Sequence, residues 1–540
     1  MSTVTEGRPL LSDLVGAGSA LATLRFGVDG DPISAEHLLV DGSKYFGHGD
    51  AECVGLIATN DRSTVEVFLG AIATGARVVS LPLPGRGSAL TDYVHFLERA
   101  AESHGVKEVL ARDDYAKLLD SVGITSRAHS DVARAPLAAP RDGGFSLVQY
   151  SSGSTADPKS ILHNDQTLGA NVDAIMRMIE PRPGDGTVSW LPLSHDMGLV
   201  GILFTGIASM SRDRIGHGDV VLMEPEQFLR APRRWLAAID QFQASISAVP
   251  DFGLRHAAAT APRDALDLSS MRCLIVGGEV VRADTLTTFA RTFARCGLVP
   301  TSICPSYGLA EIGVAATMTR PSDDWSSFAV DAVGLANDRL LAPTKSSGLI
   351  DLVSCGEPLD DYAVEAPGDG FRVGPITISG PSVGYDANGE SLAGPDGRLR
   401  TGDKGFVRGG KLFISGRDDD YVVVRGRTVY APQIERTLDA LPGIRPGRTI
   451  AVVLGDGRFV VACEIPRSAG NLADSDRLLL VRAVRRAVIS GIQVDPDEIE
   501  IMSPGMLPMT SSGKIQRSKA AAMLAAIRFG DDGKSDLTGH

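Results

Sequence analysis

The chain has 540 residues, of which 43% are hydrophobic, and a formal net charge of −13. This length exceeds one ordinary core and predicts two or more domains, while charges of both signs without a basic stripe argue against nucleic acid as the main partner. The 6 cysteines are dispersed without a CxxC pair, so they predict neither a disulfide framework nor a zinc site.

The first residues of the chain and its apolar segments indicate where in the cell the protein is expected. The first 15 residues, MSTVTEGRPLLSDLV, contain an acidic residue and no basic region before an apolar core, so they do not predict a secretory signal. The longest apolar candidate, residues 198–210, is too short and too rich in glycine for a transmembrane helix. We therefore expect a cytoplasmic protein with no transmembrane segment.

Strand and helix patterns alternate through the first 400 residues. Residues 54–59, 63–74 and 76–84 predict a strand, helix and strand of a parallel sheet. Further strands are predicted at 145–150, 187–193, 245–250 and 272–278. This order is typical of an α/β fold, in which ligands bind beyond the carboxyl ends of the strands.

After about Arg400 the pattern changes to hairpins. Residues 405–416 predict a turn at Gly409 and Gly410, and residues 451–465 a turn at Asp456 and Gly457. An amphipathic helix is predicted at 474–492. The charged run after Gly416 is interpreted as an exposed linker, which gives an N-terminal domain at 1–416, a hinge at 417–420 and a C-terminal domain at 421–540.

A polar segment, YSSGSTADPKS at 150–160, follows one of the predicted strands. The Walker pattern requires glycine before its lysine, whereas Pro158 precedes Lys159 here and has no N–H to donate. Taken alone, the segment is compatible with a solvated turn and with a different kind of phosphate-binding loop.

Four more motifs follow in order: WLPLSHDMGLVG at 190–201, PSYGLAE at 305–311, RTGD at 400–403 with SGRDDDYVVVRGRTVYAPQIE at 415–435, and PMTSSGKIQR at 508–517. Together the five motifs resemble the adenylate-forming superfamily of acyl-CoA synthetases, luciferases and nonribosomal adenylation domains. QYSSGST, LPLSHDMGL, PSYGLAE and RGRTVYAPQIE are most similar to fatty-acyl-AMP ligases, the actinobacterial kind in particular. The resemblance implies a large N-terminal domain of doubly wound sheets and a small, mobile α+β C-terminal domain.

The resemblance implies an ATP and Mg²⁺ site. The phosphates would be held by Ser151, Ser152, Gly153, Ser154, Thr155 and Lys159. Glu311 would bind Mg²⁺, because a hard cation prefers carboxylate oxygen. Asp403, assisted by Arg417, would accept hydrogen bonds from the ribose hydroxyls.

The adenine, by the same resemblance, would lie against Tyr307 in the Ser306, Tyr307, Gly308 segment. The backbone of Gly277, Gly278 and Glu279 would lie on its other side. Ordinary structural interpretations also exist, with Tyr307 as a core aromatic residue and Asp403 as a turn former.

The catalytic groups implied by the resemblance lie in both domains. Lys514 would bridge the acyl carboxylate and the α-phosphate, then leave as the small domain turns about Asp419, a hinge position assigned to within one residue. His195 would border the acyl carboxylate. The apolar segment containing Met197, Gly198 and Gly201 would form one wall of the acyl pocket, because glycines leave a gap, although a tightly packed core helix fits the same pattern.

The implied reaction is ATP-dependent activation of a medium- or long-chain fatty acid to acyl-AMP, with transfer to the phosphopantetheine thiol of an acyl carrier protein. Fatty-acyl-AMP ligases usually carry an insertion that hinders the domain swing, and the 91 positions from Glu311 to Gly402 show no obvious extra block. Free coenzyme A is therefore an alternative acceptor, as in a fatty acyl-CoA synthetase. A non-catalytic nucleotide- or lipid-binding protein on the same fold is a third hypothesis, which the joint presence of Lys159, Glu311, Asp403 and Lys514 argues against.

Overall fold

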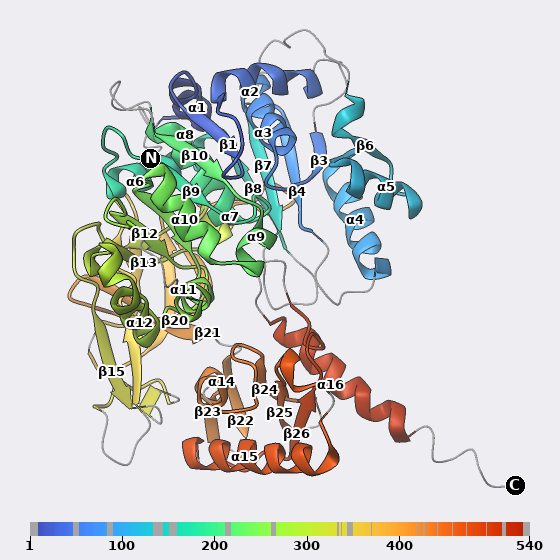
Figure 1. Cartoon of the computed structure of the whole chain (residues 1–540), viewed down its shortest axis with the longest axis vertical. Coiled ribbons are helices and arrows are strands. Elements are labelled where there is room, and N and C mark those ends of the chain that lie inside the picture. The colour runs from blue at the N-terminus through green and yellow to red at the C-terminus, as the bar shows by residue number, and fades with distance from the viewer. Residues whose placement is uncertain are drawn as a thin grey trace, which may run out of the picture.

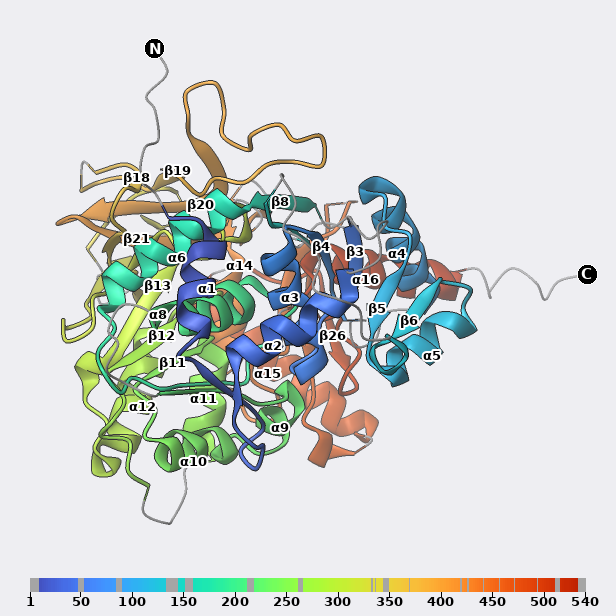
Figure 2. The same cartoon turned by 90° about the horizontal axis from the view of Figure 1, so that it is seen from above.

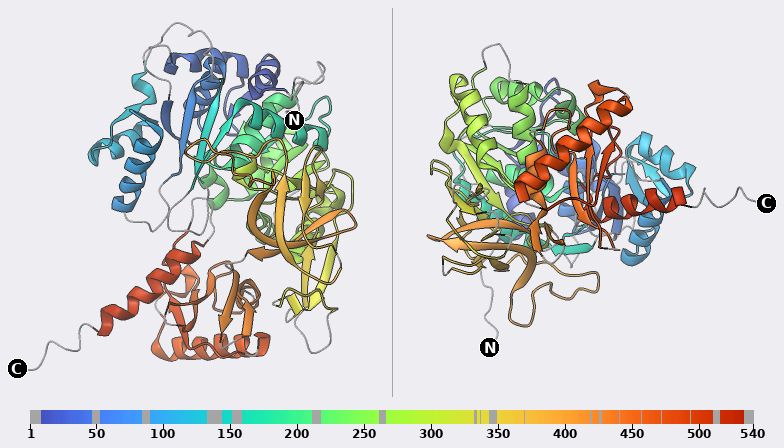
Figure 3. Two further views of the ribbon diagram at one scale, coloured as in Figure 1. Left: turned by 180° about the vertical axis from the view of Figure 1, so that it is seen from behind. Right: turned by 90° about the horizontal axis from the view of Figure 1, so that it is seen from below.

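The computed structural model describes most of the chain, and Figures 1, 2 and 3 show it from four sides. The described residues are 9–46, 53–83, 90–132, 144–150, 159–210, 218–260, 266–331, 334–335, 337–342, 349–368, 370–417, 420–424, 427–439, 441–455, 457–470, 472–492, 494–509 and 515–532. A large N-terminal domain lies above a smaller C-terminal one in Figure 1. Among these residues, no helix is long and apolar enough to cross a membrane.

One large sheet of the N-terminal domain has six strands. In sheet order they are β6 (Ser126–Ala128), β5 (Val109–Ala111), β3 (Cys53–Ile57), β4 (Arg77–Leu81), β7 (Ser146–Tyr150) and β8 (Ser160–Asn164). All neighbours are parallel except β7 and β8. The helices of this region are α2 (Ala35–Gly42), α3 (Arg62–Thr74), α4 (Leu90–His104) and α5 (Asp113–Ser121). The predicted strand, helix and strand at 54–84 are confirmed as β3, α3 and β4.

The two faces of this sheet are covered differently. Figure 2 shows α4 and α5 outside the sheet, with α2 and α3 toward the middle of the molecule. The apolar side chains follow this arrangement, because Val148 packs with α4 and α5 whereas its neighbour Leu147 joins the main core. Alternate residues of β7 therefore face opposite layers.

The second large sheet has nine strands. Their order is β17 (Glu357–Pro358), β14 (Thr317–Met318), β13 (Ile303–Tyr307), β12 (Cys273–Val276), β11 (Ile246–Val249), β9 (Thr187–Ser189), β10 (Asp219–Leu222), β1 (Thr23–Phe26) and β2 (Ile33–Ser34). The central strands, from β13 to β1, are parallel. The helices are α1 (Leu11–Ser19), α6 (Asp165–Ile179), α7 (Asp196–Gly198), η3 (Leu199–Phe204), α8 (Thr205–Ser209), α9 (Pro225–Arg230), α10 (Arg233–Phe242), α11 (Asp251–Ala259) and α12 (Ala283–Phe293). These strands and helices make up the doubly wound α/β architecture that the sequence predicts.

Two smaller sheets complete the N-terminal domain. One contains β18 (Ala363–Glu365), β19 (Gly374–Ser379), β20 (Leu399–Arg408) and β21 (Lys411–Arg417). The predicted hairpin is confirmed as β20 and β21, with positive φ at both Gly409 and Gly410. The other sheet, β15 (Ser327–Asp331) with β16 (Leu349–Val353), lies in the stretch where no extra block was expected. This hairpin packs through Phe328 onto Phe406 and Phe413, and Leu352 of β16 forms a bridge to Arg282. The expectation of no extra block stays a prediction.

The small domain has an α+β arrangement. Its strands are β22 (Tyr421–Val424), β23 (Arg427–Tyr430), β24 (Thr449–Val453), β25 (Phe459–Glu464) and β26 (Glu498–Met502), and its helices are α14 (Ala431–Asp439), α15 (Asp474–Ile492) and α16 (Arg517–Asp532). The predicted hairpin and the helix at 474–492 are confirmed as β24 with β25 and as α15. Figures 1 and 3 show α15 on the side away from the large domain.

Candidate active site

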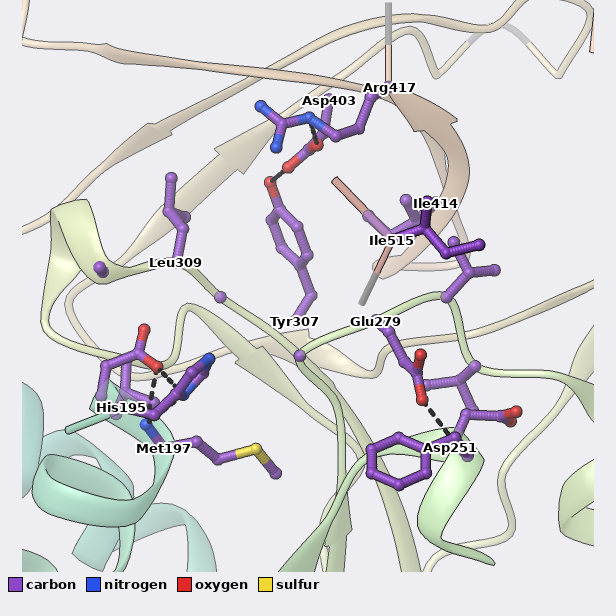
Figure 4. Close-up of a pocket in the computed structure, with 18 of the residues that line it drawn as sticks. His195, Met197, Asp251, Glu279, Tyr307, Leu309, Asp403, Ile414, Arg417 and Ile515 are labelled. Carbon is purple, nitrogen blue, oxygen red and sulfur yellow. Dashed lines mark hydrogen bonds and ion pairs between the residues drawn. The ribbon is translucent and has the colours of Figure 1, made fainter. Parts of the chain in front are cut away.

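A cavity of about 1080 Å³ lies between the two domains and is lined by residues of both. It contains many residues singled out in the sequence: Lys159, His195, Met197, Gly201, Gly278, Glu279, Ser306, Tyr307, Gly308, Glu311, Asp403 and Arg417. Figure 4 shows several of them converging from β12, β13, β20, β21 and the start of α7. The cavity thus lies beyond the carboxyl ends of parallel strands, where an open α/β sheet binds its ligands.

Asp403 is held by two side chains from different strands. The hydroxyl of Tyr307, at the end of β13, donates to Asp403 Oδ2 at 2.5 Å. Arg417 lies opposite Asp403 in the β20–β21 ladder, with Nε 3.4 Å from Oδ1. Burial and the nearby Asp403 raise the pKa of Tyr307 well above its usual value, so its hydroxyl stays a donor. The arrangement leaves an anchored carboxylate facing the cavity.

The turn after β12 brings backbone close to the cavity. A Cβ on Gly277 would lie 2.6 Å from Ser306 Oγ, and Gly278 has φ +77°, so both positions require glycine. Glu279 Oε1 accepts a hydrogen bond from the N–H of Phe252 at 2.6 Å. The Glu279 carboxylate therefore fixes the start of α11, and Gly278 brings its backbone to the cavity wall.

Glu311 lies in the short turn η6 (Ala310–Ile312) directly after β13. Burial raises the pKa of its carboxyl above the ordinary value, and the nearby Asp196 raises it further. A cation beside Glu311 would offset both effects. The described residues contain no cluster of three His, Cys, Asp or Glu side chains suited to a metal. This donor set fits Mg²⁺ that takes most of its ligands from phosphate and water.

His195 begins α7 and is fixed by its neighbours. Its Nδ1 lies 3.3 Å from the N–H of Met197, which it caps, and 2.5 Å from Asp196 Oδ1. Met197 lies on the cavity floor near Gly278, where a Cβ would meet its Sδ at 3.6 Å. The ring of His195 is thus oriented by the start of the helix.

The predicted acyl-pocket glycines behave differently. Gly201 lines the cavity, and a Cβ there would meet only the side chain of Val314, at 3.7 Å. Gly198 was predicted to line it too, and this is wrong: a Cβ would lie 2.2 Å from Pro192 O, so Gly198 serves close backbone packing. The following turn, η3, is a π-helix, a form often found at functional sites.

Several predicted residues lie outside the described part of the chain: Ser151, Ser152, Gly153, Ser154, Thr155, Lys514 and Asp419. Their roles stay predictions. The described residues that flank them do reach the cavity, since Tyr150 and Lys159 border the first segment and Ile515 follows Lys514. The domain boundaries at 417–420 likewise stay a prediction.

Asp420 corrects the expectation of an exposed, charged linker. Its side chain is mostly buried, and it accepts a hydrogen bond from the N–H of Arg417 at 2.8 Å. Arg517 Nη2 lies 3.3 Å from its other oxygen. Burial raises the pKa of the Asp420 carboxyl. Asp420 therefore ties the end of β21 to the beginning of α16.

An ion-pair cluster between the domains was missed in the sequence. Asp439 Oδ2, at the end of α14, lies 3.8 Å from Nη1 of Arg255 and 3.8 Å from Nη1 of Arg282. Burial raises the pKa of the Asp439 carboxyl. Only the fold brings these three distant residues together, so no local motif marks them.

Comparison with solved structures defines the class of protein. A structure of fatty acyl-adenylate ligases from E. coli and L. pneumophila matches with a TM-score of 0.84 and 26% identity, covering 97% of this chain and 99% of that one. An A-PCP protein complexed with phenylalanyl-adenylate matches with a TM-score of 0.78 and 19% identity, covering 98% of both chains. The fold is that of adenylate-forming enzymes.

Sequence comparison gives the family. The model of the AMP-binding enzyme family matches residues 44–340. A Caulobacter vibrioides protein named "Putative acyl-CoA synthetase" is 31% identical, covering 92% of this chain and 89% of its own. Long-chain-fatty-acid–AMP ligase FadD28 of Mycobacterium tuberculosis is 30% identical, covering 86% of both chains. The chain belongs to the AMP-binding enzyme family.

Proposed function

We propose that this protein activates a medium- or long-chain fatty acid with ATP and then passes the acyl group to the phosphopantetheine thiol of an acyl carrier protein in the cytoplasm. The observation that carries the proposal is the convergence on one cavity of an anchored carboxylate, Asp403, a buried carboxyl, Glu311, and a wall containing Met197 and Gly201. The names of relatives such as FadD28 support a fatty acid as the substrate.

The first step needs positioning and charge neutralisation. A carboxylate oxygen of the fatty acid bonds to the α-phosphorus, the bond from that phosphorus to the bridging oxygen breaks, and pyrophosphate leaves with the electron pair. Asp403 would accept from the ribose hydroxyls, and Arg417 and Tyr307 would hold it in place. Lys159, with the Ser151–Thr155 loop, would bind the phosphates, and Lys514 would bridge the carboxylate and the α-phosphate.

Mg²⁺ would supply charge neutralisation between the phosphates when bound. Glu311 would be its protein ligand, since burial raises the pKa of its carboxyl and a nearby cation would offset that effect. His195 would border the acyl carboxylate on the side of Met197. In the second step the thiol sulfur bonds to the acyl carbon, the bond from that carbon to the phosphate oxygen breaks, and AMP leaves with the electron pair while the thiol proton passes to water.

The name of FadD28, a long-chain-fatty-acid–AMP ligase, supports the carrier protein as the acceptor, because it names the formation of acyl-AMP and not of acyl-CoA. The name of the Caulobacter relative supports coenzyme A as the second candidate acceptor.

A radiolabelled fatty-acid panel with ATP and Mg²⁺ tests the proposal. We expect labelled acyl-AMP, followed by loss of the label to a phosphopantetheinylated carrier and not to free coenzyme A. Lys514→Ala should abolish acyl-AMP formation yet transfer acyl groups from supplied acyl-AMP. Efficient turnover of coenzyme A with no transfer to the carrier would establish the second candidate instead.

A further inference from the structure

Two arginine side chains of the large domain approach the same place in the cavity. Arg255 lies in α11 and Arg282 directly before α12, and both line the cavity. Their side chains are 32% and 20% exposed, so a solute in the cavity can reach both guanidinium groups. Nη1 of each lies 3.8 Å from one oxygen, Oδ2 of Asp439 in the small domain. Two guanidinium groups that converge on one oxygen form a place for an anion.

The large domain itself fixes both arginines. Asp251, which is fully buried, accepts hydrogen bonds from Nε of Arg255 at 3.0 Å and from the backbone N–H of Arg282 at 2.9 Å. Asp284 accepts from Nε and Nη2 of Arg282 at 3.0 and 2.7 Å. All of these contacts lie within the large domain, so the pair keeps its geometry if the small domain turns as proposed.

Asp439 occupies this place loosely. A distance of 3.8 Å makes an ion pair but is too long for a hydrogen bond, so neither Nη1 group donates to Asp439. Asp439 belongs to α14 of the small domain, which Figure 1 shows below α11 and α12, and it would leave when that domain turns. Another anion could then bind closer between Arg255 and Arg282, with hydrogen bonds from both.

The second step of the proposed function brings an anion of the same charge. The phosphopantetheine arm of a carrier protein is attached through a phosphodiester, which carries one negative charge as the Asp439 carboxylate does. The exchange would therefore leave the net charge of the cluster unchanged. Arg255 and Arg282 line the same cavity as His195 and Met197, so an arm held by its phosphate at this place enters the cavity proposed for the acyl group.

We propose that Arg255 and Arg282 bind the phosphate of the incoming phosphopantetheine arm after Asp439 has moved away. Asp439 then occupies the phosphate site during adenylation and vacates it for thiol transfer. The inference rests on the proposed function, because the arm is the acyl acceptor of its second step. Free coenzyme A carries a phosphate at the same end of its pantetheine, so the test separates the two sources.

The test starts from supplied acyl-AMP, so that it does not depend on adenylation. Single-turnover transfer is measured to pantetheine, which lacks the phosphate, to phosphopantetheine, to a phosphopantetheinylated carrier and to coenzyme A. We expect the rate constant for phosphopantetheine to exceed that for pantetheine about tenfold or more, because charge-assisted hydrogen bonds are gained. Added salt should reduce this ratio, since the contact is between charges.

Arg255→Gln and Arg282→Gln each remove one guanidinium group. Each should reduce the ratio of the two rate constants to about threefold or less, and the double variant should bring it to about one. The carrier should lose as much as phosphopantetheine does. Arg291→Gln, at an exposed position near the end of α12, is the matched control and should keep the full ratio. Misfolding or an altered domain position affects both thiols and leaves the ratio unchanged.

A ratio near one in the unmodified enzyme would overturn the inference, and so would arginine variants that keep the full ratio. The cluster would then act only between the domains. Arginine-dependent transfer that is faster to coenzyme A than to the carrier would support the phosphate site with coenzyme A as its source. Each of these results leaves acyl-AMP formation standing. Absence of transfer to every thiol would overturn the second step of the proposed function together with the inference.

Discussion

The carboxyl of Glu311 is surrounded by groups that oppose its ionisation. Burial raises its pKa above the ordinary value of 4.5, and Asp196 adds to the shift. Glu311 must be ionised to bind a cation. As pH is lowered, its carboxyl therefore becomes protonated, and loses cation binding, at a higher pH than an exposed carboxyl does. The same shift makes the folded protein bind a proton more tightly than the unfolded chain, so stability falls as pH rises from the unfolded pKa through the folded one.

Glu311→Gln tests both effects. Pyrophosphate release should fall by about 10²-fold or more, because a ligand for charge neutralisation is lost. Tm at neutral pH should rise, since the variant has no carboxylate to bury at position 311. The decline of Tm with rising pH should become shallower. A pH series of activity and of thermal unfolding measures both. A variant with normal activity at saturating Mg²⁺ would contradict the assigned role.

The contact of Tyr307 with Asp403 gives a second prediction. Tyr307→Phe keeps the ring and removes the hydrogen bond of 2.5 Å to the carboxylate. Because a bond to a charged group is lost, we expect the KM for ATP to rise about tenfold with a smaller change in kcat. Steady-state kinetics at varied ATP provides the measurement. Tyr421→Phe, which loses a hydroxyl contact of 3.2 Å to Ser415 and no contact to Asp403 that the structure records, serves as the control.

At the level of elements, the glycines of the segment from Asp196 to Ser209 have two different structural roles. It begins as α7, passes through the π-helix η3 and ends as α8. Gly198 packs against the backbone of Pro192, whereas Gly201 faces the cavity. The apolar pattern predicted a helix that forms a wall, and the structure confirms a helical segment at the cavity. Which glycine leaves a gap depends on contacts across the fold, which the pattern does not contain.

Alanine substitutions separate the two glycines. Gly198→Ala should destabilise the protein by about 1–3 kcal/mol, because the new methyl would overlap rigid backbone. Gly201→Ala should change Tm by no more than about 1 °C, since the added methyl group contacts only a side chain. It should lower kcat/KM for the longest acids accepted. Thermal unfolding and a chain-length series measure these effects, and equal Tm losses in the two variants would contradict the assignment.

The same limit applies to the site as a whole. Residues in motifs, such as Glu311 and Asp403, could be singled out from the sequence because the family resemblance marks them. The hairpin β15–β16 was not predicted because a long connection separates its strands, whereas a sequence marks a hairpin through a short turn. Asp439 was missed because its partners lie in α11 and before α12.

For the whole molecule, the cluster of Asp439, Arg255 and Arg282 forms ion pairs between the two domains. The two ion pairs with Asp439 are 3.8 Å long and partly buried, and the same arginines also pair with Asp251 and Asp284 inside the large domain. Ile515 of the small domain lines the cavity in this position, directly after the predicted catalytic Lys514. We therefore expect the cluster to favour the arrangement used for adenylation.

Asp439→Asn should weaken that arrangement. Pyrophosphate exchange should fall severalfold, by about a factor of 5–10 for roughly 1 kcal/mol of lost coupling, while transfer from supplied acyl-AMP stays the same or becomes faster. Single-turnover assays of the two steps distinguish these effects. Asp476→Asn, an exposed acid in the first turn of α15, is the matched control. An equal loss in both steps would contradict the role of the cluster in positioning the domains.

Rotation of the small domain would expose the buried ring of Tyr430 in every catalytic cycle. Its ring is 1% exposed in the apolar cluster of the hairpin β15–β16, and it also lies against Gly416, where a Cβ would be 2.7 Å from its Cε2. If the small domain turns as proposed, this ring must come into water once in every cycle. Turnover would then briefly expose an aromatic surface that favours aggregation. A tight acyl-adenylate analogue that stops the cycle should slow proteolysis and aggregation more than ATP alone does. The inhibited enzyme would then have a longer half-life than the enzyme in turnover.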